Sequence, residues 1–114
     1  MLTVYGLKNC DTCRKTTKWL DAEGIAHEFK DVRKDGISKD DVSTWAKAVG
    51  WETLLNRRGT TWRGLDEAPK DGVDETSAID LMTEHPALIK RPVFEKAGKI
   101  IVGFKAAEQA SLKA

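Results

Sequence analysis

The two cysteines of the chain, Cys10 and Cys13, stand two residues apart in the stretch "VYGLKNCDTCRKTTKWL", residues 4–20. Such a pair can be a disulfide staple, part of a zinc site or a reactive thiol couple. A staple is a weak interpretation, because a bridge across two intervening residues closes a very short loop. The entropic stabilisation from a disulfide shrinks with loop length.

A structural zinc site is also a weak interpretation, since such sites usually take four ligands from paired cysteines or histidines. The remaining candidates, His27 and His85, are far apart in the sequence and form no second pair. We therefore expect no metal and interpret Cys10 and Cys13 as a redox or nucleophilic couple. The alternative is two inert buried thiols.

The cysteines lie between a predicted strand and a predicted helix. "LTVYG" (2–6) alternates and is rich in residues that favour strands, and "TCRKTTKWLDAEG" is typical of a helix that ends at Gly24. "IAHEFKDV" (25–32) is typical of a second strand. A strand, helix and strand over so short a stretch predict a βαβ unit with parallel strands and a right-handed crossover.

This placement predicts different roles for the two thiols. Free backbone N–H groups and the positive end of the dipole at a helix start favour an anion. The pKa of Cys10 should therefore fall below ~8.5, and Lys8 and Arg14 add local positive charge. Cys13 lies on the same side of the helix, close enough to attack a mixed disulfide at Cys10. We expect Cys10 to attack and Cys13 to resolve, while a solvated helix face is the alternative for Arg14.

The remainder predicts a helical segment followed by two strands and a last helix. Ser38 is a plausible N-cap for a helix that Gly50 ends, and "WETLL" favours another short helix. Residues 56–72 are polar and rich in turn formers, and a further helix is expected over 74–85. The stretch "RPVFEKAGKIIVGF" predicts a hairpin around "KAGK", and "KAAEQASLKA" predicts the closing helix.

These elements predict an α/β fold of thioredoxin-like type: a βαβ half, a helical insertion and a ββα half sharing a four-stranded mixed sheet. We expect one domain over 1–114, with a core from 1–34 and 86–114 and an insertion over 35–85. Pro92 opens the third strand, a position where proline is tolerated.

Composition narrows the class of partner. The chain has 114 residues, and 19 Lys and Arg against 18 Asp and Glu leave a net charge of +1. A near-neutral protein has no overall field that favours nucleic acid or an anionic membrane. No apolar run approaches the ~20 residues of a transmembrane helix, and the start, "MLTVYG", lacks the features of a secretory signal. We expect a soluble cytoplasmic monomer that binds neither nucleic acid nor membranes directly.

Four stretches resemble the ArsC/Spx family, and the likeness is closest to its YffB-type branch: "YGLKNCDTCRKTTKWL", "LLNRRGTTWRGLDE", "LMTEHPALIKRPVF" and "GKIIVGF". The resemblance spans nearly the whole chain and implies a thioredoxin-like fold. It also implies that Cys10 is the nucleophile, that Arg91 helps to bind an oxyanion, and that Pro92 is a cis-proline facing the active site.

The chain departs from the glutaredoxin-coupled arsenate reductases of this family at two positions. Asn56 and Gly103 stand where those enzymes carry anion-binding arginines, and Arg57 and Arg58 follow directly after Asn56. These departures predict poor arsenate reduction. Conversely, Cys13 is a feature of the Spx-like regulators, which use a CxxC switch and bind RNA polymerase.

Two functions follow as expectations. The first is a thiol oxidoreductase that binds no cofactor and uses glutathione, with or without glutaredoxin, to reduce a disulfide, a mixed disulfide or, poorly, an oxyanion. Arg91 suits an anionic substrate because its planar fork matches a carboxylate or oxyanion. Arg57 and Arg58 are expected to meet the carboxylates of glutathione, or else to form a solvated basic loop. The second function is a redox switch that docks on the RNA polymerase α-subunit.

Overall fold

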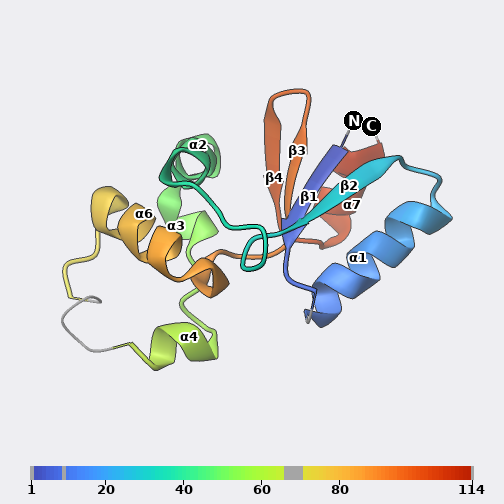
Figure 1. The fold of residues 1–114 in the computed structure, drawn as a ribbon. Coiled ribbons are helices and arrows are strands. Elements are labelled where there is room, and N and C mark those ends of the chain that lie inside the picture. Colours follow the sequence, from blue (N-terminus) through green and yellow to red (C-terminus); the bar gives the residue numbers. More distant parts are fainter. Residues whose placement is uncertain (1, 9, 66–70, 114) are drawn as a thin grey trace. The chain divides into compact units, whose positions relative to one another are not determined.

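The structure is a computed structural model that describes residues 2–8, 10–65 and 71–113. It divides into two compact units (Figure 1). The first combines the two ends of the chain, Met1–Gly36 and Arg91–Ala114, and the second is Ile37–Lys90. The organisation of the chain as one domain stays a prediction.

The first unit begins with the predicted βαβ arrangement. Strand β1 (Leu2–Gly6) is followed by helix α1 (Asp11–Ala22) and strand β2 (His27–Asp31). β1 and β2 pair in parallel, with Val4 opposite Phe29. The helix ends just before Gly24, whose φ of +69° is a conformation that glycine adopts without steric cost. The prediction for this part of the chain is confirmed.

The other end of the chain completes the sheet of the first unit. Strands β3 (Val93–Lys96) and β4 (Lys99–Val102) form an antiparallel hairpin, and helix α7 (Ala106–Lys113) follows. The hairpin turns through Ala97 and Gly98, both with positive φ, as its tight connection requires. β3 also pairs antiparallel with β1, so the strand order is β2-β1-β3-β4. The predicted four-stranded mixed sheet is confirmed.

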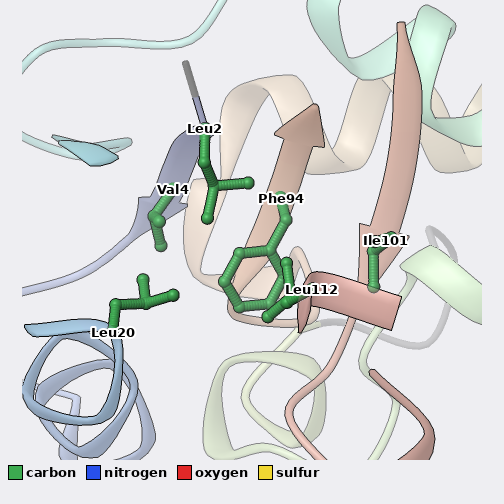
Figure 2. Packing of buried hydrophobic residues seen from close by; sticks show 6 residues of the cluster. All are labelled: Leu2, Val4, Leu20, Phe94, Ile101 and Leu112. Atoms are coloured by element: carbon green, nitrogen blue, oxygen red, sulfur yellow. The ribbon is translucent and has the colours of Figure 1, made fainter. Parts of the chain in front are cut away.

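One face of this sheet carries the core that holds the two helices of the unit. Because side chains alternate along a strand, Leu2 and Val4 share a face, and the register continues it through Phe94 and Ile101. Figure 2 shows Leu20 of α1 and Leu112 of α7 gathered around these side chains. All six residues of the cluster are buried. The far end of α1 is therefore fixed to the sheet, while Cys10 and Cys13 lie at its start.

Aromatic and charged contacts join α1 to the end of the chain outside that core. The rings of Trp19 and Phe104 meet edge to face with centroids 5.5 Å apart. The ammonium of Lys113 lies 5.8 Å from the Trp19 ring and 3.5 Å from a carboxylate oxygen of Glu23. These contacts hold the C-terminal helix against α1.

The second unit is helical. Its elements are α2 (Lys39–Val49), α3 (Trp51–Leu54), α4 (Thr60–Arg63), α6 (Glu75–Glu84) and the 3₁₀ helix η1 (Pro86–Leu88). The hydroxyl of Ser38 caps α2 by accepting the N–H of Asp41 at 3.1 Å, and Asp74 caps α6 in a capping box with Ser77. Trp45 is 1% exposed and belongs to the core of this unit.

One element of the second unit differs from the prediction. The polar stretch 56–72 was expected to form turns, yet Thr60–Arg63 makes the short helix α4. None of its residues is buried, so the sequence has no apolar periodicity to indicate it. The part of the stretch at 66–70 lies outside the described residues. Throughout the described chain, no helix combines the length and the apolar character needed to cross a membrane.

Candidate active site

The two cysteines lie at the start of α1. Cys10 is the N-cap residue, with extended backbone angles, and its carbonyl accepts the N–H of Arg14 at 3.0 Å. Cys13 is in the first helical turn and is 1% exposed, whereas Cys10 is half-buried. Both are free thiols. Within the described residues, no group of three or more His, Cys, Asp or Glu gathers where a metal ion would fit.

The surroundings of Cys10 lower the pKa of its thiol. Burial of the sulfur is the largest influence and alone would raise the pKa. The backbone N–H of Cys13, a hydrogen bond from the Arg91 guanidinium and one from the Cys13 thiol together outweigh it, and the charge of Arg91 adds to them. The sulfur makes no capping hydrogen bond of regular geometry, so the Cys13 N–H acts on it as a nearby dipole. Cys10 is therefore the thiol that ionises first.

Cys13 has the opposite surroundings. Its burial is the main reason that the pKa of its thiol is raised to about 12. A backbone hydrogen bond with Leu7 works against this rise, while the neighbouring Cys10 sulfur adds to it, both as a hydrogen-bond partner and as a negative charge. The two sulfurs thus differ sharply in reactivity, because the thiolate is the nucleophile.

Iodoacetamide is expected to modify Cys10 well before Cys13, since only the thiolate reacts at an appreciable rate. A lowered pKa means that the thiolate persists to lower pH. The Cys10 alkylation rate should therefore rise with pH and level off at an inflection below that of a free cysteine. Peptide mass spectrometry over a pH series measures both sites, with Cys10→Ser as the control for slow labelling of Cys13. Preferential labelling of Cys13 would reverse the two roles.

Arg91 comes to the cysteines from the other end of the chain. It directly precedes β3, and β3 pairs with β1 so that Val93 lies opposite Tyr5. β1 leads into the cysteine loop, so this pairing brings the half-buried guanidinium of Arg91 within hydrogen-bonding reach of Cys10. The peptide bond between Arg91 and the buried Pro92 is cis, as the family resemblance implied. The structure thus brings together four of the predicted site residues, Cys10, Cys13, Arg91 and Pro92.

Replacing Arg91 with methionine is expected to raise the pKa of Cys10. It should also slow the reactions of the Cys10 thiol by about 10²-fold, the loss of rate that is typical when one donor that stabilises negative charge is removed. Methionine keeps much of the length and removes the hydrogen bond and the charge that favour the thiolate. The measurement is the pH profile of Cys10 alkylation, whose inflection should move upward. Lys99→Met, which removes an exposed cation from β4, is the matched control. A profile unchanged in Arg91→Met would show that the guanidinium does not act on Cys10.

A buried carboxylate that the sequence analysis did not single out holds the cysteine loop. Asp31, at the end of β2, is 8% exposed. Its Oδ2 accepts the backbone N–H of Lys8 at 3.1 Å, and its Oδ1 accepts those of Arg33 and Lys34 at 2.9 Å. These hydrogen bonds, led by that of Lys34, lower the pKa of Asp31 against the opposing effect of burial. The sequence feature that could have indicated this role is an aspartate just before a polar turn. At such a position the side chain can accept hydrogen bonds from backbone N–H groups.

Gly6, the last residue of β1, leaves room for the sulfur of Cys13. A Cβ atom at this position would lie 2.5 Å from the Cys13 Sγ and 3.3 Å from a ring carbon of Phe29. The sulfur therefore packs directly against the strand backbone. This close approach explains why glycine ends the strand beside the cysteine pair.

Gly6→Ala is expected to destabilise the protein by about 1–3 kcal/mol, the usual cost of overfilling a packed site. The cost should fall when Cys13 is also replaced by alanine, because the remaining Cβ of residue 13 lies at 3.4 Å. Urea unfolding of the two single variants and the double variant measures this coupling. Equal destabilisation with and without the Cys13 sulfur would contradict the packing described.

The remaining predicted site residues are Lys8 and Arg14 of the first unit and Arg57 and Arg58 of the second. Lys8 and Arg14 are exposed, and neither is among the main influences on the pKa of the two thiols. Arg14 pairs with Asp11 at 3.0 Å. Arg57 and Arg58 belong to the second unit, where the Arg57 guanidinium lies 5.9 Å from the Trp51 ring and the Arg58 N–H meets a side-chain oxygen. A role for these four residues stays a prediction.

Comparison with known proteins agrees with this fold. The YffB protein (PA3664) has a solved structure that covers 100% of both chains at 45% identity, with a TM-score of 0.95. An arsenate reductase (ArsC) related protein from Brucella melitensis covers 96% of this chain and 92% of its own at 45% identity, with a TM-score of 0.79. The global transcriptional regulator Spx of Listeria innocua is 23% identical over 106 residues, which is 91% of this chain and 80% of that protein. The model of the ArsC family matches residues 5–112. The chain belongs to the ArsC family.

Proposed function

We propose that this protein is a cytoplasmic thiol–disulfide oxidoreductase that uses glutathione as its reductant. The observation that carries the proposal is the opposite shift of two neighbouring thiols, with the pKa of Cys10 lowered and that of Cys13 raised to about 12. The Cys10 sulfur is thereby favoured as the attacking thiolate, while the Cys13 thiol stays protonated beside it. This division suits a nucleophile and a resolving thiol.

In the first step, the Cys10 thiolate attacks one sulfur of a substrate disulfide. A new S–S bond forms between Cys10 and that sulfur, and the old S–S bond breaks. The other half of the substrate leaves as a thiolate and takes up a proton from solvent. Exchange of this kind passes through a mixed disulfide and requires a thiolate as the attacking group.

In the second step, Cys13 resolves the mixed disulfide. Once Cys10 is bonded to another sulfur, its negative charge no longer raises the pKa of Cys13, so Cys13 loses its proton more readily. It attacks the Cys10 sulfur, forms the Cys10–Cys13 disulfide and releases the second substrate thiol. Two glutathione molecules then restore both thiols, one by opening the disulfide and one by removing the first as glutathione disulfide. One substrate disulfide is thus reduced for each glutathione disulfide formed.

Arg91 and Pro92 are proposed to face the substrate beside Cys10. The Arg91 guanidinium, which already stabilises the thiolate, suits a carboxylate or oxyanion of the incoming molecule. Arg57 and Arg58 are proposed to meet the carboxylates of glutathione. Glutaredoxin is a further candidate for returning electrons.

The test is reduction of hydroxyethyl disulfide with glutathione, followed as NADPH consumption by added glutathione reductase. Glutathione-dependent turnover above the uncatalysed exchange is the expected result. Mild oxidation should also remove the mass of two protons from the intact protein, and dithiothreitol should restore it. No turnover together with an unchanged mass would overturn the redox proposal.

A second candidate function is a thiol switch whose disulfide controls docking on RNA polymerase. The observation in its favour is the CxxC pair itself, together with the relative whose name is global transcriptional regulator Spx. A pull-down with the polymerase α-subunit, run with the dithiol and disulfide forms, separates the two functions. Retention of one form only, without glutathione turnover, would favour the switch.

A further inference from the structure

A separate pocket of about 330 Å³ lies in the first unit, on the side of Cys13 rather than of Cys10. The β1–α1 loop, the first half of α1 and strand β2 surround it. Neither Cys10 nor Arg91 lines it. Its lining residues come from these three segments and are Leu7, Lys8, Cys13, Arg14, Thr17, His27 and Phe29.

The wall of this pocket, which we call the Cys13 pocket, is mainly apolar. Leu7 is 8% exposed, Phe29 is half-buried, and the Cys13 sulfur is held in its protonated form by a pKa of about 12. Small-molecule sites commonly enclose about 300–1,000 Å³, with apolar walls and a few polar groups. The volume and lining of the Cys13 pocket are of that kind.

The charged groups of the pocket have one sign. Lys8 and Arg14 line it, and no carboxylate occurs among the described residues that do. The partner of Arg14, Asp11, lies outside the lining, and both side chains are well exposed, at 65% and 87%. An exposed ion pair of this kind contributes little, so a ligand anion can replace Asp11 beside Arg14. The pocket therefore complements a negative charge attached to an apolar body.

A further polar residue of the lining, His27, has both ring nitrogens near groups that do not line the pocket. Nδ1 of His27 lies 3.0 Å from the carbonyl oxygen of Ile25. A carbonyl only accepts, so Nδ1 carries the hydrogen and donates it. Nε2 is 3.9 Å from a carboxylate oxygen of Asp21. His27 is thus engaged with its own strand and the end of α1, and the pocket's anion preference rests on Lys8 and Arg14.

We propose that the Cys13 pocket binds a small organic acid, with its apolar body against Leu7 and Phe29 and its carboxylate between Lys8 and Arg14. The Cys13 sulfur forms part of the wall, so the ligand senses the state of the cysteine pair. When glutathione disulfide oxidises the pair, two glutathione molecules form and the Cys13 sulfur bonds to Cys10 at about 2.05 Å. The Cys13 sulfur then no longer makes the same contact with the ligand, so the ligand binds the dithiol form more tightly. Linkage makes the effect reciprocal: the acid opposes oxidation.

Phenylbutyrate is a suitable probe, because it joins an aromatic body to one carboxylate. Amide-resolved NMR of the full dithiol protein should show saturable shifts centred on Leu7, Thr17 and Phe29. Phenylbutanol and phenylbutylamine have the same body, and should bind about tenfold more weakly or not at all. Shifts of equal size with all three compounds, or no saturable shift with the acid, would overturn the proposal.

Variants locate the binding site. Lys8→Gln and Arg14→Gln should each weaken phenylbutyrate binding by about fivefold to tenfold. Lys18→Gln, on the same helix but outside the lining, should leave it unchanged. Thr17→Phe should fill the pocket and abolish binding; if that variant fails to fold, the two glutamine variants decide. Wild-type affinity in both glutamine variants would overturn the proposed position of the carboxylate.

Comparing the dithiol and disulfide forms tests the contact between the ligand and Cys13. It also distinguishes failure of this binding site from failure of the proposed thiol reaction. The disulfide form, prepared with glutathione disulfide, should bind phenylbutyrate about fivefold more weakly than the dithiol form. Equal affinity would overturn the placement against Cys13. Cys10→Ser cannot form the disulfide and should bind like the dithiol wild type. Binding in that variant therefore stands even if the protein has no thiol turnover.

Discussion

Replacing Cys10 with serine is expected to reduce glutathione-dependent disulfide reduction by about 10³-fold or more, to the level of uncatalysed exchange. A serine hydroxyl does not ionise near neutral pH and does not attack disulfide sulfur. Cys13 cannot take over, because burial raises the pKa of its thiol to about 12. The NADPH-coupled assay with hydroxyethyl disulfide measures the loss.

Cys13→Ser is the matched control for this result. Serine keeps nearly the same shape next to Gly6, and the backbone N–H of residue 13 still stabilises the Cys10 thiolate. Rapid alkylation of residue 10 should persist in this variant, while the intramolecular disulfide is lost. Full turnover in Cys10→Ser would show that another thiol or another mechanism performs the reaction.

Arsenate reduction is expected to stay near background even with glutathione and glutaredoxin supplied. Loss of a donor that stabilises an oxyanion typically costs ~10²–10³ in rate. The chain lacks an arginine at both Asn56 and Gly103. At Gly103, φ is +98° and an added Cβ would lie 3.0 Å from a carboxylate oxygen of Glu108. A long side chain at residue 103 would therefore be strained.

The measurement is NADPH consumption with arsenate as the only substrate, in the wild type and in Arg91→Ala. Both proteins should give rates close to the assay without protein. Cys10→Ser supplies the baseline. Strong arsenate-dependent turnover that disappears in Cys10→Ser would show that Arg91, with Arg57 or Arg58, replaces the missing arginines.

Much of the first unit follows from local signals in the sequence. The alternation in "LTVYG" predicts β1, and Gly24 predicts the end of α1. The "KAGK" turn predicts the hairpin of β3 and β4. Each of these signals acts over a few residues, so the sequence alone is enough to place the element. The joining of β3 to β1 came instead from the order of elements and the family resemblance.

The features that the sequence did not predict depend on contacts between distant residues. The hydrogen bonds of Asp31 to the cysteine loop require β2 to end beside that loop. Lys8 and Arg14 line the Cys13 pocket with residues of β2, which the sequence did not predict, while their role beside Cys10 stays a prediction. Local composition does not encode such arrangements, because they form only when the sheet assembles.

The pairing of β3 with β1 also decides when the cysteine pair becomes reactive during protein synthesis. Both cysteines are made early, whereas Arg91 is added only after the whole of Ile37–Lys90. On an unfinished chain, Cys10 lacks the guanidinium that stabilises its thiolate, and the loop lacks the neighbouring strand that fixes it. The Cys10 thiol of a nascent chain that has not reached Arg91 should therefore titrate more like an ordinary free cysteine than it does in the folded protein.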